Sequence, residues 1–199
     1  MWTRALPWIA KEPGCKVTVA NPTDAELVQA CLEGHREAFD VIVERHQRHV
    51  YQLCYRFAGN HEDANDLAQD VFIRAYRGLK TFKGQASLGT WLYRIGVNVC
   101  LTRASAKTRT QPLDPLLGAH DERVASREET AADALLRGER AAQVRAAIAR
   151  LPKKQRATLV LRVYHDLPHE QIAGILGSSV GAVKANFFHA LNNLKKLLS

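Results

Sequence analysis

Cysteine and long apolar runs are scarce in this chain of 199 residues. Its four cysteines form no CxxC pair and no spacing with histidine typical of a zinc site, which excludes a disulfide scaffold and a recognisable zinc site. No stretch approaches the roughly 18 consecutive apolar residues of a membrane-spanning helix. The apolar stretch around Pro7 is too short for a signal peptide. We therefore expect a cytoplasmic protein with reduced thiols and no insertion into the membrane.

Motifs for catalysis and cofactor binding are also lacking. The sequence has no glycine-rich phosphate loop, no nucleophile motif and no internal repeat. We therefore expect no enzyme activity, no catalytic residues, no metal and no cofactor. Strand signals are nearly absent, whereas apolar residues recur at helical spacing, so the expected fold class is all-α.

The helical periodicity falls into two groups. The predicted helices cover residues 24–33, 36–58, 61–80, 88–104, 128–150, 153–165, 168–176 and 179–197. Residues 1–22 are predicted to be a flexible tail, and residues 106–138 a flexible linker rich in Pro and Gly, with a helix beginning near 128. The chain is thus expected to form two small helical domains, 23–105 and 139–199.

Charge differs between these two domains. The chain carries a net charge of +8, and most of this excess lies in residues 139–199. Residues 23–105 are balanced, but every acid lies at or before Asp70 and most bases follow it. Such polarity arises from two solvated helix faces or from two different partners, and segregation over the whole domain favours two partners. The basic excess favours an anionic partner.

Residues 169–184 have the spacing of a helix-turn-helix, with Gly177 at the turn and Ile172, Leu176 and Val183 as the wedge between the helices. Such a pair also occurs as ordinary packing, but the basic charge of this domain favours DNA. The predicted buried face of the last helix consists of Val183, Phe187, Ala190, Leu194 and Leu198. The predicted outward residues are Lys184, Ala185, Phe188, His189 and Asn192.

Three carboxylates, Asp63, Asp66 and Asp70, follow the i, i+3, i+7 spacing of one helix face. Paired carboxylates bind metals or transfer protons, but no His or Cys lies beside these on that face. Two other interpretations stay open: a solvated helix amino terminus, where acids are favoured by the helix dipole, and a surface that binds a basic protein.

Downstream, Phe82, Lys83, Trp91, Tyr93 and Arg94 interleave aromatic and basic side chains without any acid. Single-stranded nucleic acid is bound by such surfaces, because rings stack on bases while cations follow the phosphates. Trp91 has a second interpretation as a core residue. The sequence predicts a strand-binding surface here.

These motifs together resemble the extracytoplasmic-function (group 4) sigma factors of bacterial RNA polymerase. The resemblance rests on residues 59–72, 90–95 and 151–156, the last of which precede the helix-turn-helix. It covers 24–104 as the family's region 2 and 139–198 as its region 4. It implies a non-enzymatic factor that binds RNA polymerase core and directs promoter recognition and transcription initiation.

The resemblance also assigns the candidate residues to three surfaces. Contacts with polymerase core are implied for Asp63, Asp66, Gln69, Asp70 and Phe72. Contacts with the −10 element are implied for Lys80, Phe82, Lys83, Gln85, Ser87, Trp91, Tyr93 and Arg94. Contacts with the −35 element are implied for Lys184, Ala185, Phe188 and His189. Many members have Arg where this chain has Asn186 and His189, and primary sigma factors have two adjacent aromatics where it has Trp91-Leu92.

The implied partners are the β′ clamp and β flap of RNA polymerase core, promoter DNA, and an anti-sigma factor, which in this family is often membrane-tethered. Two alternatives are a helix-turn-helix regulator that binds DNA without polymerase, and a helical hydrolase built on Asp63, Asp66 and Asp70. The first predicts tight DNA binding by the protein alone, and the second predicts metal-dependent turnover.

Overall fold

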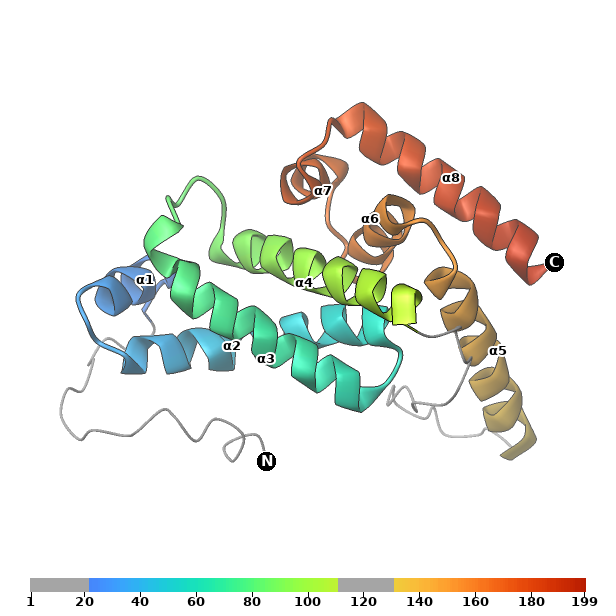
Figure 1. Cartoon of the computed structure of the whole chain (residues 1–199), viewed down its shortest axis with the longest axis horizontal. Coiled ribbons are helices and arrows are strands. Elements are labelled where there is room, and N and C mark those ends of the chain that lie inside the picture. Colours follow the sequence, from blue (N-terminus) through green and yellow to red (C-terminus); the bar gives the residue numbers. More distant parts are fainter. Residues whose placement is uncertain (1–21, 111–130) are drawn as a thin grey trace.

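A computed structural model describes residues 22–110 and 131–199 (Figure 1). These residues form eight α-helices, one 3-10 helix (η1, Leu79–Thr81) and no strand. The α-helices are α1 (Asp24–Leu32), α2 (Glu37–Ala58), α3 (His61–Gly78), α4 (Leu88–Thr110), α5 (Ala131–Ala149), α6 (Lys153–Tyr164), α7 (His169–Leu176) and α8 (Val180–Leu198). The all-α prediction is confirmed. The predicted tail, most of the predicted linker and the predicted helix start near 128 lie outside the described residues.

Local capping chemistry sets the helix ends. Thr23 forms a complete capping box with Glu26 at the start of α1, and the side chain of Asn60 accepts the amide of Asp63 at 2.8 Å at the start of α3. Gly59 ends α2 and Gly177 ends α7, both in the left-handed conformation that glycine adopts without a steric penalty.

The N-terminal domain consists of α1–α4, with α2, α3 and α4 packed against one another. Its core includes Ile42, Leu53, Val71 and Leu92, all nearly or fully buried. Gly96 of α4 allows the closest approach, because a Cβ there would lie 2.7 Å from Leu53 Cδ2. A larger residue at position 96 would require the buried side chain of Leu53, or α4 itself, to move.

The C-terminal domain consists of α5–α8, and α8 packs on α5, α6 and α7. Ile172 and Val183 are fully buried, which confirms two residues of the predicted wedge, while Ile175 is buried more deeply than Leu176. The prediction that Leu198 is buried was wrong, since its exposed fraction is 47%. Leu198 lies in the last turn of α8, beyond the helices that cover the earlier apolar residues.

The two domains are in contact. Helix α6 packs on α2, and α7 packs on α4, so α6 and the first helix of the helix-turn-helix lie against the N-terminal domain (Figure 1). Within the described residues, no helix is long and apolar enough to cross a membrane.

Candidate functional site

Helix α3 presents the predicted acidic residues unequally. Asp66 is exposed, and Gln69 and Asp70 are half-buried; we call these three residues the acidic face. Asp63 has structural partners instead, because its carboxylate accepts from Asn60 Nδ2 at 2.9 Å and lies 3.8 Å from the guanidinium of Arg103. It therefore stabilises the start of α3.

Phe72 was expected to contact polymerase core, but its side chain points inward and is only 8% exposed. It belongs to the core formed with α2 and α4. A large ring buried at this level contributes to stability through packing.

No group of three His, Cys, Asp or Glu side chains among the described residues could hold a metal ion. Asp63, Asp66 and Asp70 share a helix face without forming such a group, and Asp63 is tied to Asn60.

The predicted strand-binding residues gather around η1, the segment 82–87 and the first turns of α4. Five are exposed: Lys80, Lys83, Gln85, Ser87 and Arg94. Three are half-buried: Phe82, Trp91 and Tyr93. We call these eight residues the basic aromatic surface. The structure thus brings together, on adjoining elements, side chains up to fourteen positions apart in the sequence.

Trp91 is a packing residue that also lies beside a candidate strand-binding residue, Phe82. Its ring lies 5.3 Å from that of Phe82, and a Cβ at Gly78 would lie 3.6 Å from Trp91 Cζ2. The indole therefore packs against the end of α3 and against the ring of Phe82. Ser87 has a local role as well, because its hydroxyl accepts the amide of Thr90 at 3.2 Å.

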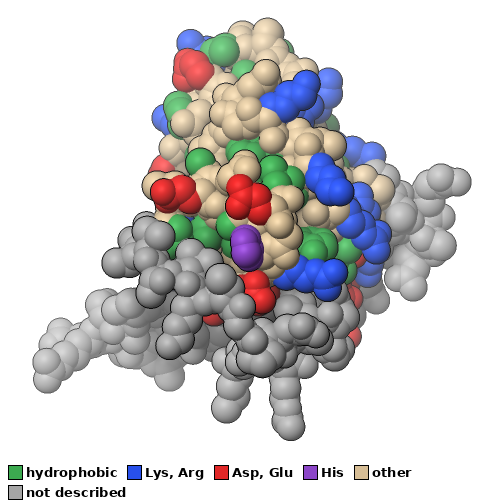
Figure 2. All heavy atoms as spheres, turned by 90° about the vertical axis from the view of Figure 1, so that its left-hand side faces the viewer, with side chains coloured by type: hydrophobic (Ala, Val, Ile, Leu, Met, Phe, Trp, Pro, Cys, Tyr) green, Lys and Arg blue, Asp and Glu red, His purple; other side chains and the backbone are tan. Residues whose placement is uncertain are grey.

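Figure 2 shows the left-hand side of the view in Figure 1, where α1 and the segment 82–87 lie. Most of the Lys and Arg side chains on this face lie along its right-hand side, and most of the Asp and Glu side chains lie to the left of them, with hydrophobic side chains between the two groups (Figure 2). The two signs of charge are thus largely, though not completely, separated on this face of the molecule.

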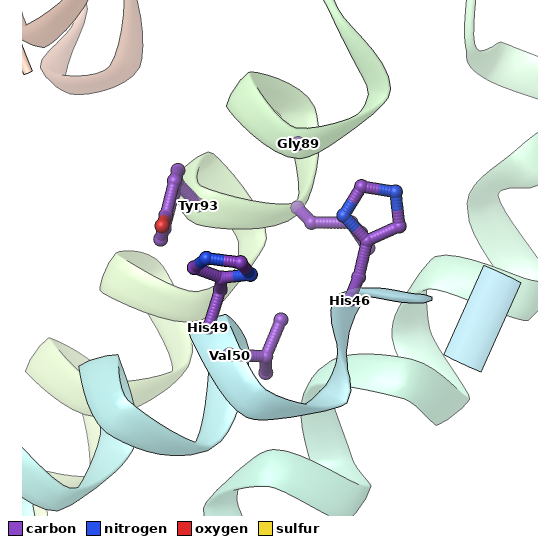
Figure 3. A pocket seen from close by; sticks show the side chains of 6 residues that line it. His46, His49, Val50, Gly89 and Tyr93 are labelled. Atoms are coloured by element: carbon purple, nitrogen blue, oxygen red, sulfur yellow. The ribbon is translucent and has the colours of Figure 1, made fainter. Parts of the chain in front are cut away.

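A shallow cavity of about 190 Å³ lies between α2 and α4, lined by His46, His49, Val50, Gly89, Leu92 and Tyr93 (Figure 3). His46 Nε2 lies 3.1 Å from Asp24 Oδ2, which fixes this imidazole against α1. Neither histidine is among the site residues that the sequence predicts. The lining is mostly apolar and carries no charged cluster for a ligand.

Tyr93 occupies the border between this cavity and the C-terminal domain. Its hydroxyl lies 3.0 Å from Nδ1 of His165, which follows α6. Burial raises the pKa of Tyr93 and lowers the pKa of His165 to about 4, with further lowering by His49 and Arg56. The sequence offered no signal for this contact, because the two residues are far apart in the chain.

Helix α8 presents the last predicted surface. Lys184, Ala185, Phe188 and His189 are all exposed, Phe188 by 61%, while Val183 and Ala190 on the opposite side are fully buried. We call the four exposed residues the reading face. Ser179 begins the helix, and its hydroxyl accepts the amide of Ala182 at 3.2 Å. A helix exposed in this way fits the major groove of B-DNA.

Comparison with known proteins gives concordant findings. Residues 42–110 match the family model of Sigma-70 region 2, and residues 141–194 match that of Sigma-70, region 4. The chain is 34% identical to the RNA polymerase sigma-H factor of Pseudomonas aeruginosa, with 88% of this chain and 93% of that protein covered. It is also 34% identical to the ECF RNA polymerase sigma-E factor of Escherichia coli K12, with 84% and 90% covered.

Two solved structures are similar to this one. The structure of CnrH in complex with the cytosolic domain of CnrY matches with a TM-score of 0.63 at 25% identity, covering 88% of this chain and 96% of that one. The sigma factor RpoE of Bartonella quintana, solved with the anti-sigma factor NepR, matches with a TM-score of 0.61 at 18% identity, covering 80% and 96%, and so supports the fold alone.

Proposed function

Because the chain belongs to the extracytoplasmic-function sigma factors of the sigma-70 family, we propose that it binds RNA polymerase core and directs it to promoters through the three surfaces described above. The observation that carries this proposal is their coexistence in one chain, with the acidic face and basic aromatic surface in region 2 and the reading face in region 4. A factor of this kind catalyses no reaction itself and acts in the cytoplasm, where the polymerase works.

The acidic face is proposed to bind polymerase core. Asp66 is exposed and Gln69 and Asp70 are half-buried, so they are available to a basic partner, unlike Asp63. Negative side chains steer the approach of a positive surface and fix its orientation, while they contribute little to the fold.

The basic aromatic surface is proposed to hold the separated strand of the −10 element. Lys80, Lys83 and Arg94 are exposed for contact with phosphates, and the half-buried ring of Phe82 lies against Trp91 in reach of a base. Because the ring of Phe82 is already held by Trp91, stacking of a DNA base on it requires little further ordering of side chains.

The reading face is proposed to recognise the −35 element. Lys184 offers donors to a guanine edge or a phosphate, and Phe188 offers apolar contact to a thymine methyl group. Of the two positions where many relatives carry Arg, Asn186 is half-buried and His189 is exposed, so His189 is the more accessible to DNA.

An anti-sigma factor is proposed as a further partner. The similar structure of CnrH contains the cytosolic domain of CnrY, and the RpoE structure contains the anti-sigma factor NepR. The inhibitor of this chain would have to cover the acidic face or separate the two DNA-binding surfaces to prevent initiation.

Run-off transcription tests the proposed function. Purified core enzyme would be given a pool of genomic DNA fragments with and without this protein, and the transcripts would be sequenced. We expect new transcripts with shared upstream sequences only when protein and core are both present. Tight, sequence-specific DNA binding by the protein alone, without core-dependent transcripts, would support the helix-turn-helix regulator instead.

A further inference from the structure

The reading face accounts for little of the positive charge of the C-terminal domain. Residues 139–199 hold ten Lys or Arg against three Asp or Glu, and this excess is what favours DNA as the partner. Yet Lys184 is the only Lys or Arg among the four residues of the reading face. Other cations that meet an anionic partner must therefore lie elsewhere on the domain.

Two of these cations lie on the same helix as the reading face. Lys195 and Lys196 are exposed in the last turn of α8, and this helix contains no Asp or Glu. Because an α-helix turns by about 100° per residue, Lys195 points within about 20° of the direction of Lys184, eleven positions earlier. Lys196 has the same relation to Ala185. We call Lys195 and Lys196 the distal lysines.

The side of α8 between the reading face and the distal lysines is open to solvent. Leu191 and Asn192 lie there and are exposed, Leu191 by 45%. The opposite side of α8 packs on the rest of the domain, since Ala190 is fully buried and Asn193 Nδ2 donates to Gln155 Oε1 at 2.8 Å. One continuous exposed side of the helix thus carries both groups of residues.

The length of this exposed side exceeds the width of a DNA groove. A rise of about 1.5 Å per residue places Leu191 about 10 Å and Lys195 about 16 Å from Lys184 along the helix axis. The major groove of B-DNA is about 12 Å wide and is bordered by phosphates. When α8 crosses the groove with Lys184 at the base edges, Leu191 still faces the groove, whereas the distal lysines lie at its phosphate border.

The chemistry of lysine suits a phosphate contact, because its ammonium is a point charge on a flexible stem and binds phosphate without a fixed geometry. A purely structural role is the simplest alternative, since cations near the end of a helix are favoured by the partial negative charge of its last carbonyls. An acidic protein is a second alternative. DNA is favoured over a protein because the distal lysines share one exposed side of α8 with the reading face.

We propose that the distal lysines bind phosphates of duplex DNA at the edge of the −35 element, in a sequence-independent contact beyond the bases that the reading face recognises. This inference rests on the proposed function, because it extends the DNA interface of region 4. Phosphate contacts fix the position and orientation of a protein on the duplex without reading sequence. The distal lysines would therefore position α8, and base preference would stay with the reading face.

The salt dependence of duplex binding tests this proposal. Fluorescence anisotropy would measure binding of the full chain to a labelled random-sequence duplex of about 30 base pairs, roughly three helical turns, between about 50 and 200 mM salt. Lys195→Gln/Lys196→Gln should reduce the slope of log K against log salt by about 1.8, since each phosphate contact contributes about 0.9. Over this range the wild-type affinity should therefore fall about twelvefold more than that of the variant.

Two control variants separate contact from total charge. Lys195→Arg/Lys196→Arg keeps both charges and should retain the wild-type slope. Arg150→Gln/Lys154→Gln removes two exposed charges around the start of α6, where the adjacent Gln155 is bonded to the packed side of α8. This variant has the same net charge as Lys195→Gln/Lys196→Gln but should keep the wild-type slope to within about half an ion.

The remaining outcomes would overturn the proposal. A variant of the distal lysines that unfolds at lower urea concentration but keeps the wild-type slope would leave them only a structural role. Loss of binding to polymerase core with an unchanged slope would indicate a protein partner, and a wild-type chain without measurable duplex binding at about 50 mM salt would exclude the contact.

These measurements need neither polymerase nor a promoter, so they are independent of the run-off test. A reduced slope without core-dependent transcripts would reject the proposed function and leave the phosphate contact standing. Core-dependent transcripts with an unchanged slope would reject the phosphate contact alone.

Discussion

The two domains present their candidate surfaces in different ways. The reading face consists of four exposed residues on one helix, whose buried side chains lie on the opposite face. The candidate residues of the N-terminal domain come from α3, η1, the segment 82–87 and α4, and Phe72, Trp91 and Tyr93 among them are also packing residues. Binding and folding are therefore separable on α8 and coupled in the N-terminal domain.

The largest expected effect is a loss of folding stability on substitution of Phe72, which tests whether this residue serves folding or binding. Because its ring is buried in the core of the N-terminal domain, Phe72→Ala should lower the free energy of unfolding by about 3–5 kcal/mol. Urea denaturation followed by circular dichroism measures this loss, and Asp66→Ala on the exposed side of α3 is the matched control. Selective loss of core binding at unchanged stability would place Phe72 in the interface after all.

Reversal of the acidic face should separate binding from folding within the same helix. Asp66→Lys/Asp70→Lys should weaken binding to polymerase core by about 2–4 kcal/mol, because like charges would then face each other across the interface. The free energy of unfolding should change by no more than about 1 kcal/mol. Titration of labelled core measures affinity, and Glu44→Lys reverses an exposed acid on α2 as control. Equal affinity for wild type and double variant would exclude this face.

In the basic aromatic surface, substitution of Trp91 should change DNA binding and folding together, whereas substitution of Phe82 or Lys83 should change DNA binding alone. Phe82→Ala should cost about 1–3 kcal/mol in binding to single-stranded −10 DNA, since it removes a stacking ring, and Lys83→Ala should reduce the salt dependence as well. Trp91→Ala should lose binding and helicity together, because the indole supports Phe82 and covers Gly78. Normal strand binding by Phe82→Ala would remove this ring from the site.

Local chemistry explains why the helices were predictable. Predicted helix ends within the described residues agree with the structure to within two positions in all helices but one, because caps such as Thr23, Asn60 and Gly177 act on adjacent backbone groups. The exception is α4, which was predicted to end at residue 104 and continues to Thr110, into the predicted linker. The exposed residues of α8 were also predictable, since a single helix lying on a domain surface has one buried stripe.

Long-range packing explains what was missed. The inward position of Phe72, the capping of α2 by Arg156 and the bond between Tyr93 and His165 depend on how helices distant in sequence cross. Periodicity within one helix carries no information on which neighbour covers it. The same limit applies at Leu198, where the apolar pattern continues past the last helix that packs against it.

On α8, substitutions should change sequence reading without changing stability. If Lys184 contacts a guanine, Lys184→Ala should cost about 1–3 kcal/mol on the preferred promoter and relax base preference at one position. If it contacts a phosphate, affinity should fall equally on every sequence and the salt slope should decrease by about one ion. His189→Arg should shift preference toward guanine, and Phe188→Ala should reduce discrimination at unchanged salt slope. Identical −35 substitution profiles for all variants would exclude the reading face.

The smallest expected effect concerns pH and the contact between the domains. His165 has a pKa lowered to about 4, chiefly by burial and further by the positive charge of Arg56 and by His49, while Asp166 opposes this shift. A histidine whose pKa is lower while the two domains are in contact takes up a proton more readily when the domains separate. The contact between the domains is therefore favoured at neutral pH and weakens as pH falls from about 6.5 toward 4.

Because His165 is only partly buried, solvent screening should limit the loss in free energy of the contact between the domains to about 1 kcal/mol at pH 5, with no change above pH 7. The radius of gyration measured between pH 7.5 and pH 5 should therefore rise for wild type and stay constant for His165→Ala, which has no imidazole to protonate at this contact. In the contact between the domains, the imidazole of His165 meets the ring and the hydroxyl of Tyr93. Protonation of His165 would weaken this contact, because Arg56 already places a positive charge beside the imidazole. A wild-type protein that remains equally compact across this range would show that protonation of His165 is not coupled to domain separation, and would confine the coupling of the two domains to Arg156.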